Sequence, residues 1–291
     1  MNFTMSDTIP AVAQPKPVED AARPPHERRS WFELRQDIPA WGYRALAAGS
    51  FLALAALWWW ASHRELLNPI FLPTPEAVWD AARTAFADEN LWLDLRASFL
   101  RVVAGFLLAV AMAIPLGILI GGFRVCEAVL QPITEFVRYI PVPALIPILM
   151  VVFGIEEFSK IMLIWVGTFF QLVLMVADEV RRVPHDLLQV SSTLGAGRAE
   201  VLRLVLWRSA MPGIFDALRL ANGWAWTYLV VAELIAANEG LGYRILKFSR
   251  FLQTPKIWVY LLLLGLIGLA LDFAFRLLNR RLFHWADTSQ R

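Results

Sequence analysis

Hydrophobic residues along this chain gather into six long runs that are separated by polar segments. A helix needs roughly 20 apolar residues to cross the hydrocarbon core of a bilayer, and the runs of 17 to 25 residues approach or exceed this length. They cover residues 45–61, 102–123, 139–155, 161–177, 213–237 and 257–278. The pattern predicts an all-α, polytopic membrane protein with six transmembrane helices.

The third run is interrupted by Pro141, Pro143 and Pro147, and an amphipathic stretch from Glu127 to Arg138 precedes it. Proline lacks a backbone N–H and clashes with the preceding helical turn. Irregular backbone at membrane depth is tolerated only beside protein or a water-filled cavity. We therefore expect a broken helix beside such a cavity.

Six spans place both termini on the same side of the membrane. If that side is the cytoplasm, the cytoplasmic segments carry about twice as many Lys and Arg residues as the outer segments, in agreement with the positive-inside rule. We therefore predict cytoplasmic termini, which also places the polar segment at 180–212 in the cytoplasm.

This polar segment alternates helix and turn signals. Pro184 favours the first turn of a helix, Gly195 and Gly197 favour a turn, and apolar residues from Val201 to Leu206 share one helical face. The pattern predicts two short helices joined by a glycine turn, a shape that fits a groove on a partner. The alternative is an ordinary loop with a helix lying on the membrane.

The first 43 residues differ from the rest. Residues 1–28 are polar and rich in proline and lack the apolar stretch of a secretory signal, so we expect a flexible tail. Residues 30–43 mix aromatic with charged side chains and are expected to form either a helix on the membrane surface or a linker.

Composition supports a membrane protein and excludes two other classes. Hydrophobic residues make up 58% of the chain, against about 45–50% in a soluble domain. A net charge of +2 gives no reason to expect a nucleic-acid partner. Cys126 is the only cysteine and the four histidines show no ligand spacing, so we expect no metal site.

The stretch "QVSSTLGAGR" at 189–198 resembles the cytoplasmic loop of binding-protein-dependent ABC importer permeases. The family motif has Glu-Ala-Ala, three residues and then a glycine. Alignment on Gly195 puts Gln189, Val190 and Ser191 at the Glu-Ala-Ala positions, so Gln189 replaces the family glutamate.

Four further stretches resemble the nitrate, sulfonate and taurine branch of these permeases. They are "NPIFLPTPEAVW" (68–79), "RYIPVPALIPILMVVFGIEEFSKI" (138–161), "VVAELIAANEGLGYRI" (230–245) and "RLLNRRLFHW" (276–285). The resemblance implies a type I importer permease domain over residues 44–286, with tails at 1–43 and 287–291.

The resemblance also implies partners. A second permease copy, two ABC ATPase subunits and a periplasmic substrate-binding protein would assemble with this chain in the lipid of the bacterial inner membrane. The chain carries no Gly-x-x-x-x-Gly-Lys-[Ser/Thr] phosphate loop, so ATP and Mg²⁺ would be bound by the ATPase and no cofactor by this chain. The segment seated in the ATPase would include Gln189, Ser192, Thr193, Leu194, Gly195, Ala196 and Arg198.

Other candidate residues lie in the spans, where ionisable groups usually face a cavity or each other. Arg138 is expected either to contact substrate, because guanidinium groups suit oxyanions, or to pair with Glu135 or snorkel to the interface. The rest of the expected substrate path is Tyr139, Pro141, Pro143, Trp224 and Thr227, where the alternative for the aromatic residues is packing. Glu233, Gly240 and Gly242 are expected to hold an external gate loop. Asp216 and Arg219 are expected to form an ion pair.

The sequence thus favours a permease subunit, not an enzyme, that imports a small oxyanion or organosulfonate. Within the same architecture, a neutral or cationic metabolite such as a pyrimidine vitamin precursor is the alternative substrate. A stand-alone secondary transporter would be built from inverted repeats, which the sequence does not show. A membrane-embedded enzyme would need a catalytic set such as His with carboxylates, and no predicted span contains His.

Overall fold

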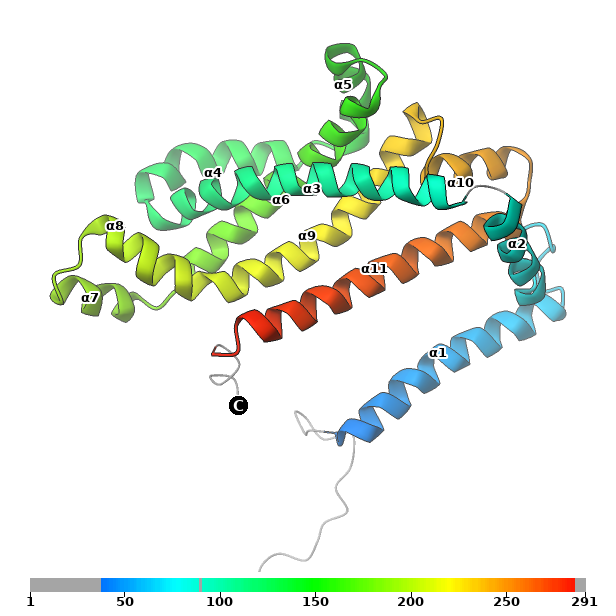
Figure 1. Cartoon of the computed structure of the whole chain (residues 1–291), viewed down its shortest axis with the longest axis horizontal. Helices are drawn as coiled ribbons and strands as arrows, with labels where there is room; N and C mark the ends of the chain where they lie inside the picture. The colour runs from blue at the N-terminus through cyan, green and yellow to red at the C-terminus, as the bar shows by residue number, and fades with distance from the viewer. Residues whose placement is uncertain (1–37, 89–90, 286–291) are drawn as a thin grey trace, which may run out of the picture. The chain divides into compact units, whose positions relative to one another are not determined.

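The computed structural model describes residues 38–88 and 91–285, and every regular element in these ranges is a helix (Figure 1). The elements are α1 (Ala40–His63), α2 (Pro75–Asp88), α3 (Leu91–Gly122), α4 (Arg124–Arg138), η1 (Val142–Leu145), α5 (Ile146–Phe153), α6 (Glu157–Arg181), α7 (His185–Thr193), α8 (Arg198–Glu200), η2 (Val201–Leu206), α9 (Trp207–Ala236), α10 (Leu241–Arg250) and α11 (Thr254–Leu282). The predicted all-α fold is confirmed.

The N-terminal tail predicted at 1–28 and the C-terminal tail at 287–291 lie outside the described residues. Of the surface helix or linker predicted at 30–43, only residues 38–43 are described, and α1 begins at Ala40.

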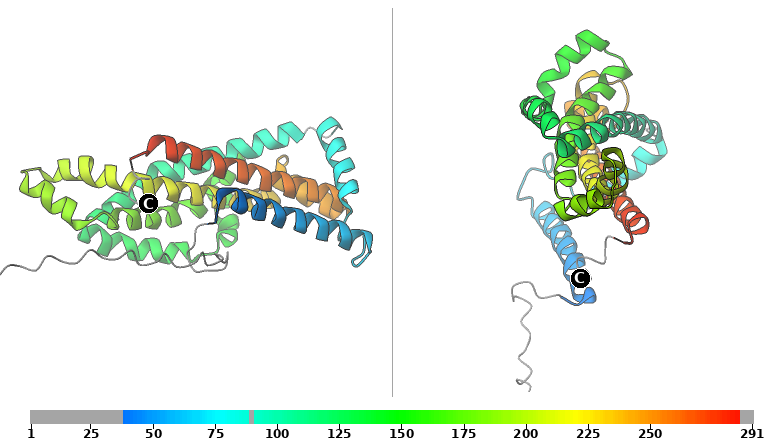
Figure 2. Two further views of the ribbon diagram at one scale, coloured as in Figure 1. Left: turned by 90° about the horizontal axis from the view of Figure 1, so that it is seen from below. Right: turned by 90° about the vertical axis from the view of Figure 1, so that its left-hand side faces the viewer.

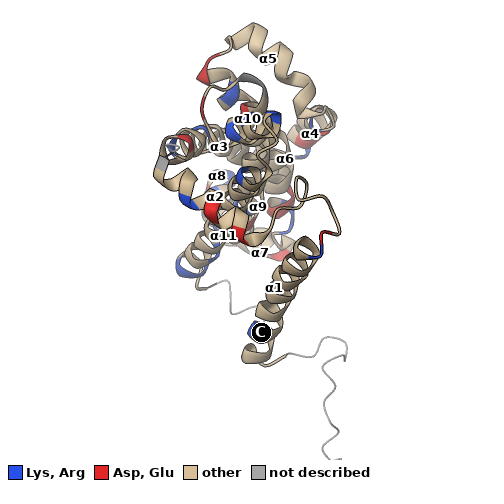
Figure 3. Cartoon of the chain, turned by 90° about the vertical axis from the view of Figure 1, so that its right-hand side faces the viewer, with Lys and Arg blue, Asp and Glu red and all other residues tan. Residues whose placement is uncertain are grey.

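The chain divides into two compact units, residues 1–56 and 57–291. The described part of the first unit is the beginning of α1. This helix carries no Asp, Glu, Lys or Arg after Arg44 (Figure 3), and side chains such as Phe51 and Leu52 are exposed. An apolar helix with an exposed apolar surface is typical of a span that faces lipid.

Three helices, α3, α6 and α9, pack together in the second unit (Figure 2). Every fourth residue of α3 from Gly105 to Gly121 is Gly or Ala, and residues four apart share one face of a helix. A Cβ atom added at Gly105 would lie 2.8 Å from Ile164 of α6, and one at Gly117 would lie 2.6 Å from Val176. Small residues therefore allow the two helices to approach closely, as is typical of membrane helix pairs.

Four helices are long and apolar enough to cross a membrane, namely α1, α3, α6 and α11, and a bent pair of helical segments makes a fifth candidate. The fifth predicted run, 213–237, coincides with α9, which has 30 residues but does not meet this criterion among the described residues. Length and composition alone therefore support four or five spans, fewer than the six predicted from the hydropathy pattern.

The charges of α9 explain its lower hydropathy, and three of them, Asp216, Arg219 and Glu233, have charged partners. Arg219 lies 3.6 Å from Asp216 on the same helix and 3.3 Å from Asp272 on α11, which confirms the predicted ion pair and extends it to a second helix. Glu233 is fully buried and bound to Arg101 of α3. Paired charges lower the cost of burying a helix among apolar neighbours.

The bent pair lies at the prolines, as predicted. The chain turns by 91° between α4 and the segment Val142–Phe153, which comprises η1 and α5. Pro141 precedes η1, Pro143 lies in its first turn, and Pro147 lies at the start of α5. These positions suit proline because the first residues of a helix have no helical acceptor for their N–H groups.

Candidate functional site

The first candidate site is a buried polar cluster at the end of the second unit that carries α10, opposite the end that carries α7 and α8 (Figure 1). It begins on α3, where Asp94, Ser98 and Arg101 share one helical face because of their spacing of four and three residues. Their exposed fractions are 1%, 0% and 3%. Buried polar groups of this kind require partners, and other helices supply them.

The partner of two of these residues is Glu233, near the end of α9, which is 0% exposed. Its carboxylate accepts hydrogen bonds from Nη1 of Arg101 at 2.7 Å and from Oγ of Ser98 at 2.8 Å. The backbone N–H of Gly242 donates a third, at 2.8 Å. Charge-assisted bonds to a carboxylate are among the strongest in proteins, so this carboxylate ties α3 to the segment that follows α9.

Arg101 also contacts α6 and the loop between α9 and α10. Its Nε and Nη2 donate to the two carboxylate oxygens of Glu157 at 2.5 and 2.8 Å, and its Nη1 donates to the carbonyl of Glu239 at 2.8 Å. Lys160 approaches the same Glu157 at 2.6 Å. A planar guanidinium group suits such a fork of acceptors, so one side chain joins three helices and a loop.

The loop is held through its backbone as well. The N–H of Gly240 donates to Asp94 at 2.9 Å, and the N–H of Leu241 donates to Oγ of Ser98 at 2.9 Å. Gly240 has φ of +119°, a conformation that residues other than glycine rarely adopt. A Cβ atom there would also overlap the carboxylate of Glu233, and one at Gly242 would lie 2.9 Å from the carbonyl of Val230. Both positions therefore require glycine, because neighbouring atoms lie too close to leave space for a side chain.

The predicted gate residues Glu233, Gly240 and Gly242 thus meet in one place, although their function as a gate stays a prediction. Sequence reasoning assigned no role to Arg101, Ser98, Asp94 or Glu157. Arg101 directly precedes the run predicted at 102–123, and its spacing of seven from Asp94 was the available signal of a shared helix face.

The second candidate site is the segment predicted to meet the ATPase, which we call the connecting segment (residues 184–208). It consists of α7, a turn, and then α8 and η2, which continue into α9. The predicted helix–glycine turn–helix pattern is confirmed. The second helix is not short, because it continues without a break into the fifth predicted run.

The turn of the connecting segment depends on Gly195, whose φ is +81°. The N–H of Ala196 donates to the carbonyl of Ser191 at 3.1 Å, which closes the end of α7. A glycine in this conformation is a common helix C-terminus. Arg198 begins α8 after the turn.

Apolar side chains of α7 remain exposed around this turn. Leu194 is 82% exposed and Val190 is 56% exposed, and Gln189 is exposed beside them. The hydroxyls of Ser192 and Thr193 donate to carbonyls of their own helix. The end of α7 and the turn therefore expose the apolar side chains of Val190 and Leu194 among polar ones, and this surface is available to a partner.

The third candidate site is the break between α4 and η1. Nη2 of Arg138 donates to Oη of Tyr139 at 3.1 Å, and the guanidinium group lies 4.9 Å from the centre of the tyrosine ring. Tyr139 is 74% exposed. The carboxylate of Glu135 accepts a hydrogen bond from the side-chain amide of Gln131. The alternative pairing of Arg138 with Glu135 is not observed.

The remaining residues of the predicted path are separate from this pair. Pro141 and Pro143 shape η1, whereas Trp224 and Thr227 lie on α9. Trp224 packs partly buried against the core, and Thr227 is exposed with its hydroxyl bonded to the carbonyl of Gly223. In the described part of the chain, no hydrogen bond or ring contact links them to Arg138. The structure describes no group of three or more His, Cys, Asp and Glu able to hold a metal, again within the described residues.

Comparison with known proteins identifies the fold and the family. Residues 113–284 match the family described as "Binding-protein-dependent transport system inner membrane component". The taurine transport system permease protein TauC of Escherichia coli K12 is 35% identical over 245 residues, which cover 82% of this chain and 89% of TauC. The putative aliphatic sulfonates transport permease protein SsuC of Bacillus subtilis is 31% identical, over 81% of this chain and 85% of SsuC.

A third relative is the nitrate import permease protein NrtB of Synechocystis, 31% identical over 64% of this chain and 67% of NrtB. Among solved structures, a chain of the MetNI methionine ABC transporter in an inward-facing conformation superposes with a TM-score of 0.58 at 21% identity, covering 66% of this chain and 95% of that chain. The fold is therefore that of a type I importer permease. The chain belongs to the family of inner membrane components of binding-protein-dependent transport systems.

Proposed function

We propose that this chain is the permease subunit of an ATP-driven importer for a small oxyanion or organosulfonate. The observation that carries the proposal is the 35% identity over 89% of a taurine permease. The other relatives named above are permeases for aliphatic sulfonates and for nitrate. Taurine, alkanesulfonates and nitrate share a negatively charged group of oxygen atoms around one central atom.

The exposed guanidinium group of Arg138 supports an anionic substrate. It lies at the break between α4 and η1, where prolines prevent a regular helix. The ring of Tyr139 lies against one face of the guanidinium group, and its hydroxyl accepts a hydrogen bond from it. Arg138 has no carboxylate partner among the described residues. In this proposal Arg138 attracts the anion to the path, and Tyr139, Pro141, Pro143, Trp224 and Thr227 belong to its walls.

The proposed assembly has two copies of this chain, two ABC ATPase subunits and a periplasmic binding protein in the bacterial inner membrane. ATP and Mg²⁺ are held by the ATPase subunits. Exposed apolar side chains around the helix break support a second copy as the neighbour, since Val151 is 86% exposed and Phe136 is 72% exposed. Apolar surfaces of this kind face lipid or another chain.

In the assembly the connecting segment couples ATP hydrolysis to the spans. The support is its exposed apolar surface at Val190 and Leu194, its rigid turn at Gly195 and its continuity with α9. Because α9 also carries Glu233 at its far end, movement of one end of this helix reaches the buried polar cluster at the other. Both termini and the connecting segment lie in the cytoplasm in this proposal, and the polar cluster closes the opposite end of the path.

Growth of a deletion strain tests the substrate class. Cells that lack this gene should fail to use taurine or an alkanesulfonate as their sulfur source, or nitrate as their nitrogen source, and the intact gene should restore growth. Gly195→Val, made in the complementing gene, should not restore it. Normal growth of the deletion strain on all three substrates, together with loss of uptake of a neutral or cationic metabolite, would contradict the proposed substrate class. The substrate would then be that metabolite.

A further inference from the structure

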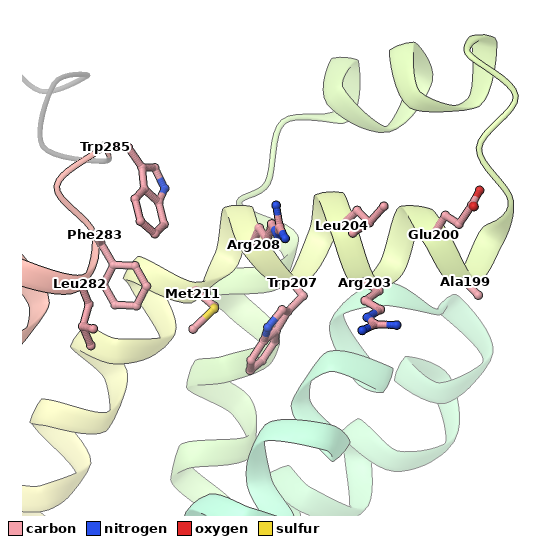
Figure 4. Close-up of a pocket in the computed structure, with 10 residues that line it drawn as sticks. All are labelled: Ala199, Glu200, Arg203, Leu204, Trp207, Arg208, Met211, Leu282, Phe283 and Trp285. Carbon is pink, nitrogen blue, oxygen red and sulfur yellow. The ribbon is translucent and has the colours of Figure 1, made fainter.

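A cavity of about 1030 Å³ lies between the beginning of α9 and the end of α11, and it shares the residues from Ala199 to Arg208 of its lining with the connecting segment (Figure 4). It lies within the second unit, at the end that carries α8. One wall is the helix formed by α8, η2 and the first turns of α9, and the other is the chain from Leu282 to Trp285. Figure 4 shows the rings of Phe283 and Trp285 facing the start of α9.

The cavity is positively charged. Arg203 and Arg208 line it, and neither has a carboxylate partner in the part of the chain that the structure describes. The one acidic residue of the lining is Glu200, whose carboxylate accepts a hydrogen bond from the N–H of Gly197 at 2.9 Å. Glu200 is thus engaged at the start of its own helix, and two guanidinium groups remain for an anion.

The rest of the lining is apolar and aromatic. Trp207 lies one helical turn after Arg203, so the two side chains share a face, and Figure 4 shows them on the same side of the helix. Met211 and Leu282 add aliphatic surface near the ring of Phe283. A free inorganic anion would gain nothing from contact with this apolar lining. A molecule with a charged head group and hydrocarbon chains would contact both the arginines and the apolar side chains.

The position of the cavity identifies the kind of molecule. Leu282 is the last residue of α11, one of the helices long and apolar enough to cross a membrane. The cavity therefore lies where a span leaves the hydrocarbon core. Trp side chains concentrate at this level of a bilayer, and basic pockets between helices there suit anionic lipid headgroups.

The helix wall has an unusual backbone beside the cavity. Val201–Leu206 form a π-helical segment, and the N–H of Trp207 donates to the carbonyl of Leu202, five residues earlier. Segments of this kind are frequent at functional sites because they change which side chains share a face. Here the segment contains Arg203 and directly precedes Trp207 and Arg208.

We propose that this cavity binds an anionic phospholipid. The phosphate lies between the guanidinium groups of Arg203 and Arg208, and the acyl chains lie along Met211, Leu282 and the aromatic rings. This site is independent of the proposed substrate. It places a lipid against the helix that joins the connecting segment to α9.

The test uses the complete transporter, purified in detergent and exchanged into mixtures of phosphatidylglycerol and phosphatidylcholine with identical acyl chains. Retained lipids are counted by native mass spectrometry. Near an anionic surface each arginine strengthens binding about fivefold, so Arg203→Gln/Arg208→Gln should reduce retained phosphatidylglycerol strongly and leave phosphatidylcholine unchanged. The matched control is Arg280→Gln/Arg281→Gln, which removes the same charge from exposed residues of the last turn of α11 that do not line the cavity.

The single variants Arg203→Gln and Arg208→Gln, each with an intermediate expected loss, keep the test decisive if the double variant does not fold. Equal phosphatidylglycerol retention in the wild type and the double variant would overturn the proposal. Displacement of the lipid by millimolar inorganic phosphate would identify a simple anion site instead. Loss of the ATPase subunit with unchanged lipid retention would make the cavity a protein contact and would equally overturn the proposal. None of these results depends on which substrate is transported.

Discussion

The guanidinium group of Arg101 and the carboxylate of Glu233 form an ion pair of 2.7 Å in which the two side chains are 3% and 0% exposed. The pair joins the beginning of α3 to the end of α9, which are 132 residues apart along the chain. Removal of one member of a buried pair leaves an uncompensated charge, which costs about 3–5 kcal/mol. The pair therefore provides a direct test of the buried polar cluster.

Arg101→Met should lower the free energy of unfolding by about 3–5 kcal/mol because Glu233 would remain buried without its partner. The double variant Arg101→Met/Glu233→Leu should recover much of this stability, because apolar residues can replace a buried pair. Transport should not recover, since the loop would have lost the hydrogen bonds of Arg101 to the carbonyl of Glu239 and of the Gly242 N–H to Glu233. Thermal unfolding of the purified transporter and an uptake assay together check this. Full transport by the stable double variant would show that the cluster has only a structural function.

Gly240→Ala tests the close approach of the loop to Glu233. A residue other than glycine at φ of +119° is strained by about 1–3 kcal/mol, and its Cβ atom would also overlap the Glu233 carboxylate. Gly154→Ala is the control, since Gly154 also has positive φ, +80°, but has open space around it. We expect Gly240→Ala to lower the melting temperature clearly more than Gly154→Ala does. Equal shifts of the melting temperature in the two variants would mean that the overlap with Glu233 does not lower stability.

Gly195→Val should leave the permease in the membrane and abolish substrate-stimulated ATP hydrolysis. A β-branched residue at φ of +81° is strained, so the turn that presents α7 would change. Gly195→Asn should retain most of the activity, because Asn adopts this conformation more readily. Gln189→Ala should cost far less than Gly195→Val, since the acidic residue of the family motif is already absent. If the Val variant hydrolyses ATP and transports normally, the connecting segment is not the coupling element.

Arg138→Gln should reduce uptake of the native anion about tenfold or more, because a hydrogen bond to a charged group contributes about 1.5–3 kcal/mol. Co-purification of the ATPase should be unchanged. Tyr139→Phe is the matched control, since it removes the hydrogen bond of 3.1 Å to Arg138 but keeps the ring. We expect it to have a smaller effect. Unchanged uptake by Arg138→Gln would make the arginine a structural residue.

Cysteine labelling tests the proposed topology on a background in which Cys126, the only native cysteine, is replaced by Ser. A probe at Asn68, which is exposed in the loop after α1, should react with an impermeant maleimide added to sealed cells. A probe at Gly197 should react only after the membrane is opened. Reaction at Gly197 in sealed cells would show that the orientation is the opposite one and that the connecting segment lies outside the cytoplasm.

Features with local sequence signals were predictable. Pro141, Pro143 and Pro147 predicted the break after α4, and Gly195 predicted the turn of the connecting segment, because the backbone rules for these residues do not depend on distant contacts. The continuity of η2 with α9 was not predicted, because the residues from Val201 to Leu206 were expected to form a separate short helix before the next apolar run. The cluster of Asp94, Ser98, Arg101, Glu157 and Glu233 could not be assembled from sequence, because its members lie on three helices and meet only through tertiary packing.

Uptake by reconstituted transporter tests the central proposal most directly. Proteoliposomes would contain two copies of this permease with its partner ATPase subunits, and the purified binding protein would be added outside. We expect accumulation of labelled taurine, an alkanesulfonate or nitrate that requires both internal ATP and the binding protein, and that Gly195→Val abolishes. Accumulation of these anions without ATP or without the ATPase subunit would contradict the account and would make the chain a transporter that acts alone.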